Sequence, residues 1–328
     1  MANKNSDLSV KVYHGYGYTH NLVVYGHVFS KNASRENRFS GNIFHNISHL
    51  ARLFFVKALP FAKVRLLWNK QIITAISQSD GLFRFEWKSD ENVSSGWHAV
   101  KVEALDDSEN SLASGEGKVF VPHSTQYGFI SDIDDTVMIS YSAQMWYRLK
   151  VLFSKNPRTR THFPHVAEHY KRLSRAQTEA ATPNPFFYVS SSEWNLYDYL
   201  KEFFRFNGFP EGVFLLSPLK RWNKIFRSGQ TKHQGKLLRI MRIFESFPKQ
   251  DFILFGDNSQ ADPEIYATLA EKYTSRIFAI YIRNIKPSKE AATRNILVGL
   301  EAKGIHTCLF IDSADAMKHS ESIKLIIN

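Results

Sequence analysis

Short segments in which apolar and polar residues alternate mark the first third of the chain. In the clearest case an Asp-Gly turn dipeptide is followed by Phe83, Phe85 and Trp87, which are separated by charged residues. An alternation of period two is typical of a strand with one face on a core and the other in water. Such segments predict strands at Asn21–Phe29, Ala62–Trp68, Gly81–Trp87, Trp97–Ala104 and Gly117–Val121. We therefore predict an N-terminal all-β sandwich domain over residues 1–124.

After Pro122 the pattern changes to continuous apolar runs separated by segments with helical spacing. The runs predict strands at Tyr127–Ser131, Phe186–Ser190, Gly212–Leu216, Phe252–Gly256, Ile277–Ile282 and Thr307–Ile311. Strands that are apolar on both faces and alternate with helices are typical of a parallel sheet covered on both sides. We therefore predict a Rossmann-like α/β domain over residues 125–328. Because such sheets bind ligands at the carboxyl ends of their strands, the residues at those ends indicate the function.

Capping residues predict the helix boundaries of this second domain. Asp262, with Pro263 after it, fits an N-cap and the first helical position. Gly208 fits the end of a helix over residues 194–207. Lys236 is predicted to begin an amphipathic helix that leads into the fourth strand of the domain, so its ammonium can reach the strand ends.

Positive charge exceeds negative charge by 11, because 42 Lys and Arg face 31 Asp and Glu. The excess indicates an anionic partner. Residues 141–176 hold eight Lys and Arg against one acidic residue, and residues 218–236 hold six against none. The rest of the chain is therefore slightly acidic, and composition alone does not identify the partner.

Composition also disfavours several classes of protein. With 43% hydrophobic and 22% charged residues, the chain has globular rather than disordered values. Its single cysteine, Cys308, cannot form a disulfide framework within one chain. The first residues lack the apolar core of a signal peptide, and no run reaches the ~18 apolar residues of a membrane span. We expect a cytoplasmic protein, with peripheral membrane contact left open.

Three carboxylates lie within four residues at the end of the first strand of the second domain: Asp132, Asp134 and Asp135. Such crowding is repulsive unless a cation is bound. Mg²⁺ takes oxygen ligands and leaves positions for water and phosphate, so it would neutralise this cluster and orient a substrate. An acidic N-cap or a solvated turn is the alternative explanation.

Three weaker signals follow at other strand ends and helix starts. Ser190 ends the second strand of the domain, Lys236 begins a helix, and Asp257 and Asp262 follow the fourth strand. Hydroxyl, ammonium and carboxylate groups together can bind a phosphate and a cation. Each signal alone has a structural explanation. Their order, with successive separations of 58, 46 and 21 residues from Asp132 to Asp257, makes coincidence a poor explanation.

These four signals resemble the motifs of the haloacid dehalogenase superfamily: DxDx(T/V), a strand-end Ser or Thr, a Lys, and an acidic pair. More narrowly, the chain is similar to the actin-patch phosphatidate phosphatase family and its bacterial members. The segments that carry the resemblance are residues 130–137, 186–200, 247–267 and 279–284, with 10–19 and 81–87 upstream.

The chain departs from this family pattern at three places around the expected pocket. Glu193 stands where many members have proline, Asn258-Ser259 replaces Ser-Gly, and His165 replaces a glycine. None of these positions is a motif carboxylate or the motif lysine. They therefore bear on the identity of the substrate more than on the class of reaction.

The resemblance implies a phosphomonoester hydrolase that forms an aspartyl-phosphate, with phosphatidate or a related lipid phosphate as the expected substrate. Asp132 is expected to attack phosphorus, and Asp134 to act first as general acid and then as general base. Lys236 and the Ser190 hydroxyl are expected to bind the phosphoryl oxygens.

The resemblance also implies a set of metal ligands. Mg²⁺ is expected on the carboxylates of Asp132 and Asp257 and on the main-chain carbonyl of Asp134. Thr136 and Asp262 are expected to support these ligands rather than to bind the metal. No covalent cofactor is expected.

The basic stretch between the second and third motifs is expected to overhang the strand ends as a lid that selects the substrate. Its candidate residues are Lys220, Arg221, Trp222, Lys224 and Arg227. Such basic and aromatic side chains suit an anionic membrane surface. They also suit soluble or nucleotide phosphates, although no specific nucleic-acid partner is expected. A catalytically idle scaffold that binds anionic lipid is the alternative from another class, and the role of the N-terminal domain is open.

Overall fold

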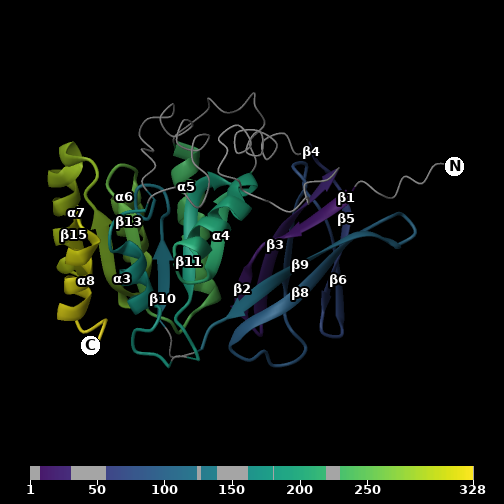
Figure 1. Cartoon of the computed structure of the whole chain (residues 1–328), viewed down its shortest axis with the longest axis horizontal. Coiled ribbons are helices and arrows are strands. Elements are labelled where there is room, and N and C mark those ends of the chain that lie inside the picture. Colours follow the sequence, from purple (N-terminus) through teal and green to yellow (C-terminus); the bar gives the residue numbers. More distant parts are fainter. Residues whose placement is uncertain are drawn as a thin grey trace. The chain divides into compact units, whose positions relative to one another are not determined.

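The computed structural model of the chain describes residues 8–30, 57–123, 127–138, 162–179, 181–218 and 230–327. The chain forms two compact units (Figure 1). The first comprises residues 1–123, 193–198 and 218–220, and the second comprises residues 124–192, 199–217 and 221–328. Each unit contains one β-sheet.

The first unit contains a nine-stranded mixed sheet. Its strands are β1 (Leu8–Val12), β2 (Gly15–Tyr18), β3 (Asn21–Ser30), β4 (Lys57–Ala58), β5 (Lys63–Trp68), β6 (Gln71–Ile76), β7 (Leu82–Trp87), β8 (Gly96–Leu105) and β9 (Ser111–Val121). Their order is β1-β3-β2-β9-β8-β5-β6, with β4 and β7 also paired to β3. The five predicted strands are confirmed, as β3, β5, β7, β8 and β9. The sheet is mixed because β2 pairs with β9 in parallel, whereas β8 pairs with β5 and β9 in antiparallel fashion.

Alternating side chains of this sheet form one hydrophobic core. Phe83, Phe85 and Trp87 are buried, and the charged residues between them are exposed, as the alternation predicts. Val64 of β5 and Leu22 of β3 belong to the same core cluster although their strands are not neighbours in the sheet. The sheet therefore curves around its core, and the two-sheet sandwich stays a prediction.

Strand β2 was not predicted from the sequence because half of its residues are glycines. A Cβ atom at Gly15 would lie 2.2 Å from the carbonyl oxygen of Val23 on β3. Glycine in a strand interior often marks such a close approach of neighbouring backbone. The glycines here therefore permit close strand packing, whereas glycine more commonly indicates a turn.

The second unit contains a six-stranded sheet. Its strands are β10 (Gly128–Ser131), β11 (Phe186–Glu193), β12 (Gly212–Ser217), β13 (Phe252–Asp257), β14 (Ile277–Arg283) and β15 (His306–Phe310). The order is β12-β11-β10-β13-β14-β15, and the pairs that β10 and β14 form are parallel. The predicted α/β unit with a parallel sheet is confirmed. The chain order reverses between β10 and β13, which is where open parallel sheets bind ligands.

Helices cover both faces of this sheet (Figure 1). They are α3 (Val166–Leu173), α4 (Tyr197–Phe206), α5 (Gln230–Ser246), α6 (Asp262–Tyr273), α7 (Glu290–Glu301) and α8 (Ser313–Ser322). On β11, Phe186 contacts Tyr170 of α3, whereas Phe187 contacts Phe247, which follows α5. Because successive strand residues point to opposite faces, α3 and α5 lie on opposite sides of the sheet.

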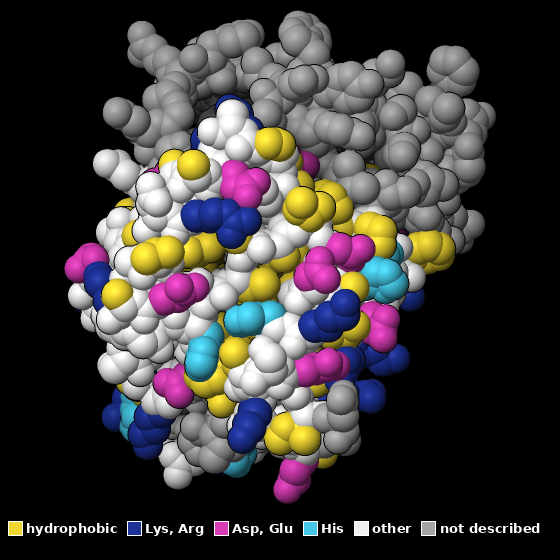
Figure 2. Space-filling view, turned by 90° about the vertical axis from the view of Figure 1, so that its left-hand side faces the viewer, with side chains coloured by type: hydrophobic (Ala, Val, Ile, Leu, Met, Phe, Trp, Pro, Cys, Tyr) yellow, Lys and Arg dark blue, Asp and Glu magenta, His cyan; other side chains and the backbone are white. Residues whose placement is uncertain are grey.

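The outer surface beside α7 and α8 carries interspersed basic and acidic side chains (Figure 2). The described residues of this face therefore show no concentration of the positive charge that the composition revealed. Within the described ranges, no helix is both long enough and apolar enough to cross a lipid bilayer.

Two helix starts differ from their predictions. Helix α6 begins at Asp262 itself, with Ala261 as the N-cap residue. The Asp262 carboxylate does not cap the helix because it accepts hydrogen bonds from Lys236 and from the N–H of Asp257. Helix α5 begins at Gln230, so Lys236 lies in its second turn and not at its start.

The predicted helix over residues 194–207 is divided. Trp194–Leu196 form a 3₁₀ helix, η1, and α4 follows from Tyr197. Gly208 follows the helix with a φ of 70°. A left-handed glycine just past the last turn is a common helix end, so the predicted role of Gly208 is confirmed.

His165 precedes α3 with a left-handed backbone, at a φ of 58°. This conformation suits glycine, the residue of the family pattern, because a Cβ atom strains it. We predict that His165→Gly raises the free energy of unfolding by about 0.5–1 kcal/mol, as the relieved strain exceeds the entropy that glycine adds to the unfolded chain. Urea denaturation measures the change. His165→Ala is the control, and an equal gain in both variants would contradict backbone strain as the cause.

Candidate functional site

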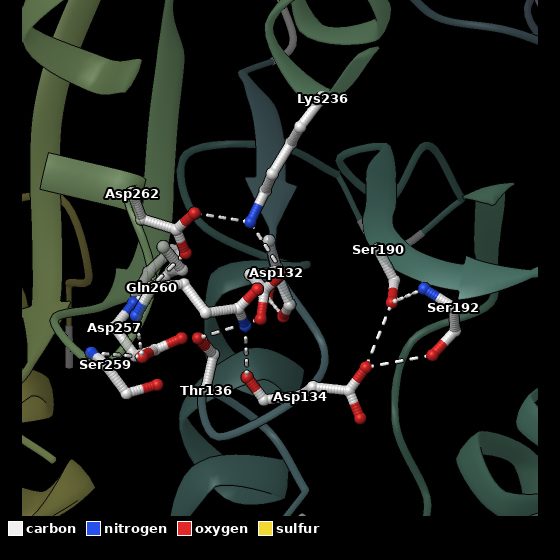
Figure 3. Close-up of polar contacts among 12 residues, drawn as sticks. Asp132, Asp134, Thr136, Ser190, Ser192, Lys236, Asp257, Ser259, Gln260 and Asp262 are labelled. Atoms are coloured by element: carbon white, nitrogen blue, oxygen red, sulfur yellow. Dashed lines mark hydrogen bonds and ion pairs between the residues drawn. The ribbon is translucent and has the colours of Figure 1, made fainter. Parts of the chain in front are cut away.

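Three buried carboxylates meet where the strand order reverses (Figure 3). Asp132 directly follows β10, and its N–H donates to the carbonyl of Phe255 on β13 at 2.9 Å. Asp257 ends β13, and Asp262 begins α6. Oxygen atoms of the three aspartates lie within 4.8 Å of one another, and each residue is at most 1% exposed. The fold thus brings the predicted first and fourth motifs together.

Lys236 places a positive charge among these carboxylates. Its Nζ lies 2.6 Å from Asp132 Oδ1 and 2.5 Å from Asp262 Oδ1. Burial favours the neutral amine, but the charges of Asp132 and Asp262 outweigh it and raise the pKa of Lys236 above its ordinary value. Lys236 is therefore an ammonium that bridges the first and fourth motifs.

A glycine permits the close approach of Asp262. A Cβ atom at Gly256 would lie 2.6 Å from Asp262 Oδ2. That oxygen accepts the N–H of Asp257 at 3.2 Å. Both Asp262 oxygens are therefore engaged by the protein, which fits the supporting role expected from the sequence.

Asp134 points away from this cluster toward two serines (Figure 3). Its Oδ2 accepts hydrogen bonds from the hydroxyls of Ser190 at 3.2 Å and Ser192 at 2.9 Å. The Ser190 hydroxyl also accepts the N–H of Ser192 at 2.9 Å. The structure thus brings Ser190 into contact with Asp134, the predicted general acid and base. Asp132 and Asp134, both of the first motif, therefore have different partners.

Asp257 combines deep burial with an unused oxygen. Its Oδ1 accepts the N–H groups of Ser259 at 2.6 Å and Gln260 at 3.3 Å. Its Oδ2 is buried and has no hydrogen-bond partner among the described residues. Burial and then the charge of Asp262 raise the pKa of Asp257 to about 7. Burial likewise raises the pKa of Asp132 well above its usual range, against the opposing charge of Lys236.

These residues fit a bound divalent cation. Three ionised carboxylates with one ammonium carry a formal charge of −2, and one carboxylate oxygen, Asp257 Oδ2, has no partner in the part of the chain that the structure describes. The main-chain oxygen of Asp134, the other expected ligand, lies 3.5 Å from Gln260 Nε2. An all-oxygen donor set is the kind that Mg²⁺ prefers.

The lid candidates Lys220, Arg221, Trp222, Lys224 and Arg227 lie outside the described residues. The same holds for residues 141–161, the first part of the other basic window.

Comparisons with known proteins connect this geometry with a family. Residues 127–284 match the family model described as "Phosphatidate phosphatase APP1, catalytic domain". The phosphatidate phosphatase APP1 of Saccharomyces cerevisiae is 36% identical over 99 residues, which cover 30% of this chain and 16% of the yeast protein. Over residues 127–284 the chain is similar to the catalytic domain of the phosphatidate phosphatase APP1 family.

Other similarities are weaker. An uncharacterized Schizosaccharomyces pombe protein is 29% identical over 100 residues, again 30% of this chain and 16% of that protein. The matches thus span about a sixth of either curated relative. Among solved structures, a carbohydrate acetylesterase from Xanthomonas citri covers 91% of this chain and 66% of its own at 9% identity and a TM-score of 0.33. That likeness is too weak to support an inference.

One departure from the APP1 family pattern has a structural explanation. The Asn258 side chain donates to Asn284 Oδ1 at 2.7 Å and to the Lys286 carbonyl at 3.2 Å. Its oxygen accepts the N–H groups of Ile285 and Lys286, both at 2.8 Å. Asn258 therefore anchors the loop that carries Asp257, and its side chain is satisfied within the protein.

Ser192 and Gln260 contact Asp134 but were not among the predicted site residues. The strand was predicted to end at Ser190, but β11 continues to Glu193. Side chains two apart on a strand share a face, so Ser192 reaches Asp134 beside Ser190. A longer strand prediction would have found Ser192. No local signal marks Gln260, whose approach to Asp134 depends on how the loop after β13 folds.

Proposed function

We propose that this chain is a Mg²⁺-dependent phosphatase of the haloacid dehalogenase type that hydrolyses phosphatidate or a related lipid phosphate through an aspartyl-phosphate. The observation that carries the proposal is the contact of Asp132 with Lys236 beside Asp257, within a region that matches the APP1 catalytic-domain model. Residues 125–328 would form the Rossmann-like catalytic domain, and residues 1–124 a separate β-sandwich domain.

Asp132 is the proposed nucleophile. Its carboxylate oxygen forms a bond to phosphorus while the bond from phosphorus to the ester oxygen breaks. Lys236 holds Oδ1, and the Thr136 hydroxyl lies 3.4 Å from Oδ2, so the carboxylate is oriented before substrate arrives. The ammonium of Lys236 also offsets the negative charge of the phosphoryl group.

Asp134 is the proposed general acid and base. In its protonated form it gives its proton to the departing alkoxide, and afterwards it takes a proton from the water that attacks the aspartyl-phosphate. That second attack breaks the bond between Asp132 and phosphorus and releases phosphate. The hydroxyls of Ser190 and Ser192 donate to one oxygen of Asp134 and orient its carboxyl group.

Mg²⁺ is the proposed cofactor, held by Asp132 and Asp257 and by the main-chain carbonyl of Asp134. When bound, it supplies positive charge that offsets the phosphoryl oxygens. The unpartnered Asp257 Oδ2 supports this assignment. Asp262 would keep Lys236 and the Asp257 N–H in place rather than bind the metal.

A soluble phosphate ester is the second candidate substrate, because in the proposed mechanism the motif residues bind the phosphoryl group alone. The lipid substrate and the peripheral membrane contact rest on the family and on the basic windows of the sequence. Binding to anionic membranes from the cytoplasmic side is part of the proposal.

The proposal is tested by a phosphatase screen of the purified chain. We predict Mg²⁺-dependent release of phosphate from phosphatidate in mixed micelles, with slower release from sugar phosphates, nucleotides and phosphorylated oligonucleotides. Excess chelator should abolish turnover, and Asp257→Ala should raise the Mg²⁺ concentration required. Full activity in excess chelator would contradict the cofactor. Faster turnover of a soluble ester than of phosphatidate would contradict the lipid substrate only.

A further inference from the structure

A buried arginine lies at the site end of β14, outside the four motifs. Arg283 is the last residue of β14 and is 1% exposed. Its partner on the neighbouring strand β13 is Asp257, and its partner on β15 is Phe310. Arg283 is thus one strand away from the acidic cluster. Burying a guanidinium costs free energy unless its N–H groups form hydrogen bonds, so the contacts of Arg283 indicate its role.

Among the described residues, this guanidinium donates hydrogen bonds only to neutral groups. Nε donates to the carbonyl of Thr136 at 3.1 Å, Nη1 to the carbonyl of Ile311 at 2.7 Å, and Nη2 to the hydroxyl of Ser313 at 2.6 Å. Its carbon lies 4.0 Å from the ring centre of Phe163 and 4.7 Å from that of Phe310. The planar fork of arginine can reach three acceptors at once, and a lysine ammonium at this position cannot reproduce that geometry.

Thr136, whose carbonyl accepts the hydrogen bond from Arg283, lies in the same tight turn as Asp132, the proposed nucleophile. The turn over residues 132–138 is closed by hydrogen bonds from Asp135 N–H to the Met138 carbonyl and from Met138 N–H to the Ile133 carbonyl, at 2.8 and 3.0 Å. Asp135 is in the left-handed region at a φ of 63°. A strained turn of this kind persists only where its surroundings hold it.

The main chain of Arg283 also forms a hydrogen bond beside the fourth motif, which contains Asp257. Its carbonyl accepts the N–H of Asn258 at 3.1 Å, directly after Asp257. We propose that Arg283 is a positioning residue: its side chain holds the turn that carries Asp132 and Thr136, and its main chain holds the loop that carries Asp257. One residue thereby sets the separation of the first and fourth motifs.

The same strand offers a matched control at its opposite end. Arg276 ends the 3₁₀ helix η3 (Thr274–Arg276), immediately before β14. Its guanidinium also donates to main-chain carbonyls, those of Phe244, Phe247 and Gln250, and it lies over two phenylalanine rings. Arg276→Lys therefore removes a similar set of contacts far from the strand ends that carry the site.

The experiment compares Arg283→Lys with Arg276→Lys in the full chain. It measures kcat and KM with Mg²⁺ and a soluble phosphate ester, the unfolding midpoint, and amide hydrogen exchange over residues 133–138. We expect Arg283→Lys to lower kcat by about 10- to 100-fold, with little change in KM, because small displacements of reacting groups have effects of this size. Exchange over residues 133–138 should become faster. Arg276→Lys should lower the unfolding midpoint and leave kcat and that exchange unchanged.

Two outcomes would overturn the inference. One is unchanged exchange over residues 133–138 in Arg283→Lys, and the other is an equal loss of kcat in both variants. The turnover measurement rests on the proposed function, whereas the exchange measurement does not. Faster exchange in Arg283→Lys with a wild-type chain that hydrolyses no phosphate ester would support the positioning role and refute the phosphatase.

Discussion

Asp132→Asn should lower phosphatase turnover by at least ~10⁴-fold, because loss of an enzyme's nucleophile has effects of this order. The asparagine amide cannot form the aspartyl-phosphate. The fold should survive, since the amide oxygen can still accept from Lys236, and one of three crowded carboxylates becomes neutral. Steady-state kinetics with a soluble ester and a thermal unfolding curve measure the two effects.

Asp135→Asn is the matched control for this prediction. It makes the same chemical change within the same turn, and asparagine tolerates the left-handed φ of 63° as well as aspartate does. The control should keep most of its turnover. If Asp132→Asn retained turnover within tenfold of the wild type, Asp132 would not be the nucleophile.

Lys236→Met should destabilise the chain by about 3–5 kcal/mol, because removing one partner of a buried ion pair leaves uncompensated buried charge. Here Asp132 and Asp262 both lose their counter-ion. Burial already raises the pKa of Asp132, and without the opposing charge of Lys236 this pKa should rise further, so the folded state of the variant should bind more protons. The loss of stability should accordingly be greater at pH 8 than at pH 5. Urea denaturation in excess chelator measures it.

Lys289→Met serves as the control for Lys236→Met. The Lys289 ammonium donates to the carbonyls of Ser259 and Gln260, in the loop between Asp257 and Asp262, and it pairs with no carboxylate among the described residues. Its removal should cost less than half as much. Equal losses in the two variants, or a loss in Lys236→Met that does not vary with pH, would show that the buried ion pairs do not set the stability of this site.

Strand positions were predictable because their signals are local. The six apolar runs after residue 122 became β10 to β15 within a few residues, and the alternation in β7 correctly separated buried from exposed side chains. The parallel sheet followed from the alternation of such runs with helices. Helix starts were less predictable, as Asp262 illustrates. Its carboxylate binds Lys236 from another helix, and this distant contact replaced the local capping role.

By itself, the sequence determined the strand-end residues, their order and the family resemblance, because each depends on residue types at short spacing. Only the tertiary structure decided which groups meet: Lys236 bridges Asp132 and Asp262, Ser190 and Ser192 hold Asp134, and Arg283 reaches Thr136. These contacts join residues that are 26 to 147 positions apart. No local pattern encodes such distances, since they depend on the strand order and on the packing of helices against the sheet.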